Sequence, residues 1–262
     1  MKHYLTTFFS LFSVSIKSYL EHRWNALGSL INSSVSLLLM ILFIEIIFSR
    51  TPEIKEWNKY EVLMLVGVYR IIAALFSTFF LSSINRMTSY IHRGDLDLFL
   101  IKPVNSQFLL SLRHIKPFEL LNTLPGLVLV VYALNYLHLV NGFIDSWLLL
   151  MGLIPGLVIL YSLYYLLATL TIWLKRFSAL SELYYVIREP LSIPIDIFGG
   201  GVSFALTFVI PMAFVITIPV KVFLEKSPTY FILVGIIIAF LFLYLSDQFW
   251  NFALKHYTSA SS

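Results

Sequence analysis

The residues best suited to chemistry are charged side chains set among apolar ones. One group lies in the stretch Arg93-Gly94-Asp95-Leu96-Asp97-Leu98-Phe99-Leu100-Ile101-Lys102-Pro103. The Asp95 carboxylate is placed to cap a helix, because it can accept hydrogen bonds from the free N–H groups of a first turn. Asp97 adds negative charge near the positive end of that helix, and Lys102 complements its negative end. The pattern predicts a short helix whose charged ends can make polar contacts.

The predicted helix runs from about Leu96 to Ile101, because Pro103 cannot continue it. Leu96, Phe99 and Leu100 share one face at the spacing i, i+3, i+4. A helix of about two turns with this much apolar surface is not stable alone in water. We therefore expect protein on both sides of it.

A second pair of charges lies inside apolar segments. Arg70 is far from either end of its segment and Glu45 is near the end of the preceding one. An unpaired arginine at mid-depth of a membrane costs about 2.5–3.5 kcal/mol on insertion scales. Two interpretations stay open: a structural tie in which Arg70 reaches Glu45 across two antiparallel helices, or a substrate or gating charge in a translocation path.

Several kinds of chemistry have no matching motif. No G-x-x-x-x-G-K-[ST] loop for phosphate binding is present, the chain has no cysteine, and the six histidines are dispersed. The net charge of +4 comes from bases scattered among apolar stretches, which is not typical of nucleic-acid binding. We expect no catalytic residues, no metal site and no cofactor on this chain.

The elements that position these residues are membrane helices. Of the 262 residues, 59% are hydrophobic and 12% charged, and the mean hydropathy is +0.86. Soluble domains carry about 25% charged residues. The sequence therefore predicts an all-α integral membrane protein, a single transmembrane domain over residues 1–262. Its six expected spans, each long enough for about 30 Å of hydrocarbon, are 25–48, 60–84, 117–138, 146–174, 195–218 and 229–250.

Residues 1–24 read as an amphipathic helix in the plane of the membrane surface; an extension of the first span is the alternative. Counting Lys and Arg orients the spans. With the N-terminus inside, twelve bases lie on inner segments and five on outer ones. Both termini and the 85–116 loop are thus predicted to be cytoplasmic. The inner bases are Lys2, Lys17, Arg23, Arg86, Arg93, Lys102, Arg113, Lys116, Lys175, Arg176, Arg188 and Lys255.

The fifth predicted span is irregular. Gly199-Gly200-Gly201 lies near its start, Pro211 lies in its later half, and the broken region extends over 190–220. Consecutive glycines followed by prolines do not form one straight helix. We expect a bent or partly re-entrant segment with Asp196 near its inner end; an ordinary proline-kinked helix is the alternative.

Aromatic residues mark the spans in two ways. Trp24, Trp57, Trp147, Trp173 and Trp250 fall at predicted span ends, as interfacial anchors do. Tyr161, Tyr164 and Tyr165 lie within an apolar span, where their hydroxyls need partners. They are expected to form interhelical hydrogen bonds, although they could also line a path for an amphiphilic substrate.

Three stretches give the chain a family resemblance: the Arg93 to Pro103 stretch, the block from Arg188-Glu189-Pro190 to Pro211-Met212-Ala213-Phe214, and the tail from Trp250 to Ser262. In these the chain resembles the six-span permeases of bacterial type-2 ABC exporters, which are encoded beside a separate ATPase. The likeness covers essentially the whole chain. It departs where similar proteins often have Arg-Tyr-Pro in place of Arg188-Glu189-Pro190, and at the triple glycine.

The resemblance implies a permease in the bacterial inner membrane, working as two permeases with two ATPase subunits that bind ATP and Mg. The short helix between spans 2 and 3 would be a coupling helix that docks in a groove of the ATPase. By position, the coupling residues would be Arg93, Gly94, Asp95, Leu96, Asp97, Phe99, Leu100, Lys102 and Pro103.

Two other functions remain open. A stand-alone secondary carrier or channel would carry more ionisable residues at mid-membrane and often an internal repeat, and a membrane scaffold would need no cavity between its spans. The substrate is expected to be hydrophobic or amphiphilic. Pairing with an identical or with a related permease fits the sequence equally well.

Overall fold

The computed structural model describes residues 2–20, 23–137, 143–174 and 180–257. The tail 258–262, used above for the resemblance, and the bases Lys175 and Arg176 lie outside these residues.

The described chain is almost entirely helical, with one hairpin of two short antiparallel strands. The first half contains α1 (Lys2–Leu20), α2 (Arg23–Phe48), β1 (Glu53–Ile54), β2 (Trp57–Asn58), α3 (Lys59–Phe76), α4 (Ser82–Arg93), α5 (Asp97–Leu100) and α6 (Ser106–Leu112). The second half contains α7 (Thr123–Leu137), α8 (Phe143–Thr169), α9 (Leu180–Arg188), α10 (Gly200–Phe204), α11 (Thr217–Phe223) and α12 (Tyr230–Leu254).

Five helices within the described residues are long and apolar enough to cross a membrane: Leu27–Phe48, Lys59–Arg93, Pro117–Leu137, Trp147–Ile172 and Tyr230–Leu254. They correspond to five of the six predicted spans. The second extends nine residues beyond the predicted end at residue 84, so the first part of the 85–116 segment is helix rather than loop. Residues 195–218 contain only short helical pieces and no helix of span length, which agrees with the predicted irregularity of this segment. A sixth crossing stays a prediction.

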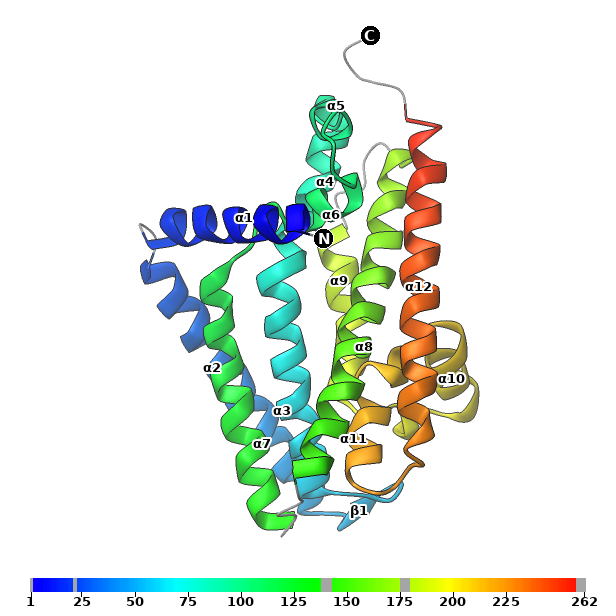
Figure 1. The fold of residues 1–262 in the computed structure, drawn as a ribbon. Helices are drawn as coiled ribbons and strands as arrows, with labels where there is room; N and C mark the ends of the chain where they lie inside the picture. The colour runs from blue at the N-terminus through cyan, green and yellow to red at the C-terminus, as the bar shows by residue number, and fades with distance from the viewer. Residues whose placement is uncertain (1, 21–22, 138–142, 175–179, 258–262) are drawn as a thin grey trace.

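The helix from Lys59 to Arg93 connects the two ends of the bundle (Figure 1). It begins at a capping box in which the Asn58 side chain accepts from Glu61 N and the Glu61 carboxylate accepts from Asn58 N. At about 1.5 Å per residue it is roughly 50 Å long. A π-helical turn, η1 (Ser77–Leu81), joins α3 to α4. The Lys116 N–H donates to the Thr78 carbonyl within this turn, at 2.8 Å.

The bundle has two distinct ends (Figure 1). At one, called here the α5 end, α5 projects beyond the bundle, α12 terminates, and α1 lies across the long helices. The ring of Phe8 on α1 contacts that of Phe79 in η1, with centroids 6.3 Å apart. At the other, called the hairpin end, β1 and β2 lie close to α11.

Small residues bring the helices together. A Cβ added at Gly126 of α7 would lie 2.8 Å from the Gly67 carbonyl oxygen and 3.0 Å from the Arg70 Cβ. Gly156 of α8 likewise lies against the backbone of Val215, where a Cβ would collide. Such close backbone approach is a common packing mode of membrane helices, and it fixes α3 against α7 at the position of Arg70.

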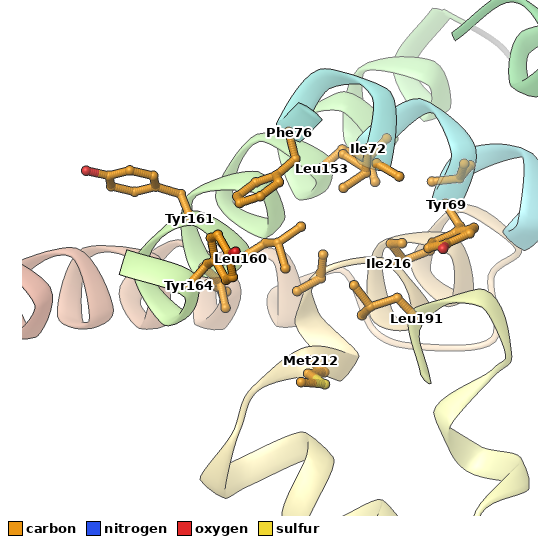
Figure 2. Close-up of a cluster of buried hydrophobic side chains, with 14 of the residues drawn as sticks. Tyr69, Ile72, Phe76, Leu153, Leu160, Tyr161, Tyr164, Leu191, Met212 and Ile216 are labelled. Carbon is orange, nitrogen blue, oxygen red and sulfur yellow. The ribbon is translucent and has the colours of Figure 1, made fainter. Parts of the chain in front are cut away.

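Aromatic rings fill the core between α3, α8 and the segments after α9 (Figure 2). The Phe76 ring stacks on Tyr184 at 5.1 Å and meets Tyr164 edge-on at 5.7 Å. The Tyr164 hydroxyl donates to Asn85, as the interhelical interpretation predicts, whereas the buried Tyr165 hydroxyl has no hydrogen-bond partner among the described residues, so the prediction fails there. Two tryptophans are not interfacial anchors: Trp57 and Trp250 are each 1% exposed and belong to this core.

Candidate functional site

The connection between α4 and α5 is a tight reversal built on glycine. Gly94 has φ 76°, a left-handed conformation that ends α4 at little steric cost. Its N–H donates to the Ile91 carbonyl and that of Leu96 donates to the Tyr90 carbonyl at 3.2 Å. These bonds satisfy the last carbonyls of α4 and direct the chain into α5.

The capping prediction at this reversal was wrong in detail. α5 runs from Asp97 to Leu100, with Leu96 at the N-cap position and no side-chain cap bond. The Asp95 side chain therefore does not cap the helix; its backbone carbonyl accepts from Leu98 N at 3.2 Å. The preceding Gly94 turn directs the chain into α5, so α5 begins without a carboxylate cap.

The apolar face of α5 also differs from the prediction. Leu96 and Phe99 are 0% and 3% exposed, because they pack inward on the loop rather than outward. Phe99 lies against Tyr90 with ring centroids 4.7 Å apart. The exposed apolar side chains are Leu98 at 59% and Ile101 at 79%, with Leu100 at 37%. We call Leu98, Leu100 and Ile101 the α5 tip.

Two basic side chains contact the ring of Phe99 beneath the α5 tip. The Arg113 guanidinium carbon lies 4.9 Å from the Phe99 ring centroid and Lys102 Nζ lies 5.6 Å from it. Arg93 is exposed, whereas Asp95 and Asp97 are partly buried. The surface around the tip thus combines apolar contact area with positive charge.

Polar bonds from α6 fix this loop to the bundle. Gln107 Nε2 donates to the Tyr161 hydroxyl and to Ser246 Oγ, both at 3.1 Å. Ser111 shares a 2.8 Å hydrogen bond with Tyr161, and Trp250 Nε1 donates to Ser106 Oγ at 2.9 Å. Sequence reasoning missed Gln107 and Ser111. Their signal was two polar residues four apart in an apolar stretch, facing the tyrosine of a later span.

The two intramembrane charges do not pair with each other. Arg70 Nη2 donates to Ser36 Oγ of α2 at 2.9 Å, whereas Glu45 forms an ion pair with Lys59 at 3.1 Å. The predicted tie was wrong because Lys59, at the start of α3, lies next to the last turn of α2, where it pairs with Glu45. Arg70 is left with a hydroxyl partner.

Arg70 lines a polar pocket of about 320 Å³ between α2, α3, α9 and the 3₁₀ turn η2 (Pro117–Asn122). α2 contributes hydroxyl and amide side chains from one face: Ser29, Asn32, Ser33 and Ser36. The ionisable members are Arg70, Lys116, Glu119, Tyr185 and Arg188. The sequence did contain a sign of the pocket, since these α2 residues recur at helical spacing in an otherwise apolar span.

Aromatic faces hold Arg188 at the pocket. Its guanidinium carbon lies 5.8, 5.3 and 5.0 Å from the ring centroids of Tyr69, Tyr184 and Tyr185. Opposite, the Glu119 carboxylate accepts from Ser29 Oγ at 3.2 Å and from Asn122 Nδ2 at 2.6 Å. The acidic group is therefore bonded within the wall, while the arginines are oriented by rings.

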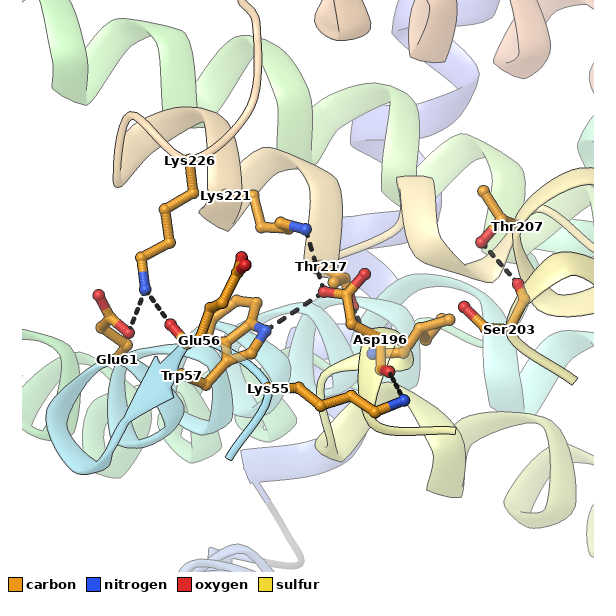
Figure 3. Close-up of polar contacts among 11 residues, drawn as sticks. Lys55, Glu56, Trp57, Glu61, Asp196, Ser203, Thr207, Thr217, Lys221 and Lys226 are labelled. Carbon is orange, nitrogen blue, oxygen red and sulfur yellow. Dashed lines mark hydrogen bonds and ion pairs between the residues drawn. The ribbon is translucent and has the colours of Figure 1, made fainter. Parts of the chain in front are cut away.

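At the hairpin end a polar cluster gathers around Asp196 (Figure 3). Its carboxylate pairs with Lys221 at 3.2 Å and accepts from Trp57 Nε1 at 3.2 Å. Its carbonyl accepts from Lys55 Nζ at 3.1 Å. The predicted topology places Asp196 at the opposite end of the bundle from the segment 49–59, and these contacts with Lys55 and Trp57 contradict that placement.

A second ion pair, Lys226 with Glu61 at 2.5 Å, joins this end to the start of α3. Lys226 also donates to the Glu56 carbonyl. Lys55 and Glu56 have φ of 45° and 68°, so the hairpin turn is left-handed at both central positions.

Gly199, Gly200 and Gly201 have open space around their Cα positions and no positive φ. Pro211 precedes the short turn Met212–Phe214. Among the described residues, no group of three or more His, Cys, Asp or Glu side chains could hold a metal ion.

Comparison with known families gives one match. A family model described as ABC-2 family transporter protein matches residues 34–261. No curated protein matches the chain. The match takes in the α5 tip and the part of the polar pocket that follows residue 34, including Arg70 and Arg188; Ser29, Asn32 and Ser33 precede it.

Proposed function

Because the chain belongs to the ABC-2 transporter family, we propose that it is the membrane-spanning permease of an ATP-driven exporter. A separate ATPase subunit supplies ATP hydrolysis, and a second permease, identical or related, completes the unit. The cargo is a hydrophobic or amphiphilic molecule that leaves the cytoplasm. The observation that carries the proposal is the exposed α5 tip at the end of the long Lys59–Arg93 helix.

The proposed topology has six crossings, with the α5 end in the cytoplasm of a bacterium and the hairpin end outside. Five crossings use the span-length helices. The remaining one uses residues 180–197, in which α9 is followed by the 3₁₀ turns Glu189–Ser192 and Ile195–Ile197, and it ends where Asp196 contacts the hairpin. Ile195 N donates to Thr217 Oγ1 at 3.4 Å. Residues 196–216 thus leave the hairpin end of the bundle and return to it. This supports a re-entrant segment that enters the membrane from the outer side.

The α5 tip is the proposed docking surface for the ATPase. The apolar side chains of this cytoplasmic loop are 37–79% exposed. A partner that covers them removes apolar surface from water, which stabilises the complex. Arg93 and Lys102 add charge at the rim, where they contribute to partner choice more than to affinity. A push on α5 passes through the hydrogen-bonded Gly94 turn to the end of the Lys59–Arg93 helix, which runs without a break to Arg70.

The test is co-purification with the ATPase encoded nearest to this chain. The double variant Leu98→Asp/Ile101→Asp places two carboxylates in the proposed contact without touching the loop core, and we expect it to lose the ATPase. Phe99 is unsuitable for this test because it is buried against Tyr90.

The matched control is Thr51→Asp/Thr229→Asp, which adds the same charge at exposed positions of the hairpin end. It should retain the ATPase. If wild type binds no ATPase, the exporter proposal is overturned and a stand-alone carrier or channel takes its place. If both double variants bind the ATPase as wild type does, the α5 tip is not the docking surface.

A further inference from the structure

The polar pocket differs from the rest of the bundle in its charge. Three basic side chains line it, Arg70, Arg188 and Lys116, against one carboxylate, Glu119. Since Glu119 already accepts hydrogen bonds from Ser29 and Asn122, it is committed to the wall. The pocket therefore carries excess positive charge facing a hollow space.

The two arginines are brought to one place. The guanidinium carbons of Arg70 and Arg188 lie 6.0 and 5.8 Å from the centroid of the same ring, Tyr69. Within the part of the chain that the structure describes, the buried Nε atoms of both have no hydrogen-bond partner. Like charges so placed repel each other; Glu189 is close enough to Arg70 to offset part of this repulsion, and a bound anion relieves the rest.

The surrounding groups suit a phosphate. Two guanidinium forks and an ammonium match an anion with several acceptor oxygens. The hydroxyls of Ser33, Ser36 and Ser77 add further donors around the space. A volume of about 320 Å³ is at the small end of ligand pockets, enough for a head group and not for acyl chains.

The larger cavity does not have this character. It measures about 610 Å³ between α8, α12 and α6 and is lined mostly by apolar side chains. Its ionisable groups are Asp247 and Tyr161 and Tyr244, none of them basic. Of these two cavities, the polar pocket is the one whose side chains favour an anion.

We propose that the polar pocket binds the phosphate-bearing head group of an anionic amphiphile, with Arg70 and Arg188 as its principal ligands. The pocket extends from Lys116 and Glu119, near the α5 end, to Arg70 deep in the bundle. A head group entering from that end reaches mid-depth without leaving polar surroundings. This role as a transport site rests on the proposed function, whereas binding itself does not depend on an ATPase.

The test is calorimetric titration of the purified chain in maltoside micelles with three probes: dihexanoyl phosphatidic acid, dihexanoylglycerol and inorganic phosphate. We expect the phosphatidic acid to bind and the uncharged glyceride not to bind. Arg70→Gln and Arg188→Gln should each weaken the phosphatidic acid by about tenfold or more, a typical loss for a charge-assisted contact. The control Arg50→Gln, an exposed arginine outside the pocket, should bind as wild type.

Each outcome of the titration supports or overturns the proposed binding site. Equal affinity of wild type for the phosphatidic acid and the glyceride overturns the proposal, as does unchanged affinity in both pocket variants. Inorganic phosphate binding as tightly as the phosphatidic acid makes a free anion the ligand and overturns the amphiphile. If a glutamine variant aggregates, Arg70→Lys and Arg188→Lys keep the charge without the fork and should bind with intermediate affinity. A chain that binds the probe but not the ATPase keeps this inference and loses the proposed function.

Discussion

His114 makes the stability of the α4–α6 region depend on pH. The ring shares a 2.5 Å hydrogen bond between Nε2 and the Tyr90 hydroxyl, and its backbone N–H donates to Ser83 Oγ. Burial lowers the pKa of His114 to about 4, with Arg86 and Arg113 contributing through charge repulsion. The folded loop therefore requires the neutral imidazole.

The sign of the pH effect follows from this depressed pKa. Unfolded His114 has a pKa near 6.5, so its contribution to stability is complete above that pH. It is lost as the pH falls from about 6.5 toward 4. We expect His114→Gln to reduce the drop in Tm between pH 7.5 and 5, measured in detergent. His92→Gln, an exposed histidine of α4, is the control and should keep the wild-type slope; equal slopes in all three proteins would contradict the role of His114.

Local chemistry at this scale could be predicted only in part. The limits of α5 could be predicted from Gly94 and Pro103, because the effect of a glycine or a proline depends on its own backbone and not on distant contacts. Which side of α5 faces outward could not be read from spacing, since Phe99 is buried by Tyr90 and Arg113 from other elements. Arg70 was recognisable as a deep charge, but its neighbour Arg188 depends on how α9 packs.

Helices are positioned here by glycine contacts as much as by apolar burial. The contact of Gly67 with Gly126 sets α3 against α7, and Arg70 lies one turn along from Gly67. Hydropathy predicted these helices because each is a long apolar run. It failed for 195–218, which is as apolar as a span but contains glycines and prolines, so composition alone could not distinguish a crossing from short broken pieces.

The glycine contact is testable with one methyl group. Gly126→Ala places a Cβ 2.8 Å from the Gly67 carbonyl oxygen, and relieving this contact requires α3 and α7 to separate. We expect a loss of about 1–3 kcal/mol of stability, typical of overpacking, measured as a lower Tm. Gly28→Ala in α2 is the control because nothing lies within 4 Å of its added Cβ. An unchanged Tm for Gly126→Ala would show that the helices are not held by this contact.

The molecule as a whole has the proposed docking surface, the α5 tip, and the polar cluster around Asp196 at opposite ends (Figure 1). The placement of 180–197 as a crossing decides on which side residue 199 lies. With the predicted span 195–218, it would be near the cytoplasm; with the proposed topology, it is outside. The sequence could not separate these, because the contact of Asp196 with the hairpin is a long-range one.

Because the chain has no cysteine, single cysteines report topology directly. We expect a membrane-impermeant maleimide to label Gly199→Cys and Thr229→Cys in intact cells. Ile101→Cys at the α5 tip should be labelled only after lysis. Labelling of Gly199→Cys only after lysis, with Thr229→Cys labelled beforehand, would restore the predicted span and refute the proposed crossing.

The π-helical turn η1 has a consequence for rotation. A π turn accommodates one residue more than an α turn, and one residue corresponds to about 100° around a helix axis. The side chains of α3 and α4 are therefore out of phase: α3 presents Gly67 to α7, while α4 presents Ser83 to the segment after α6. This single extra residue sets the angular register between Arg70 and α5, so the direction in which the tip points is determined at Ser77–Leu81.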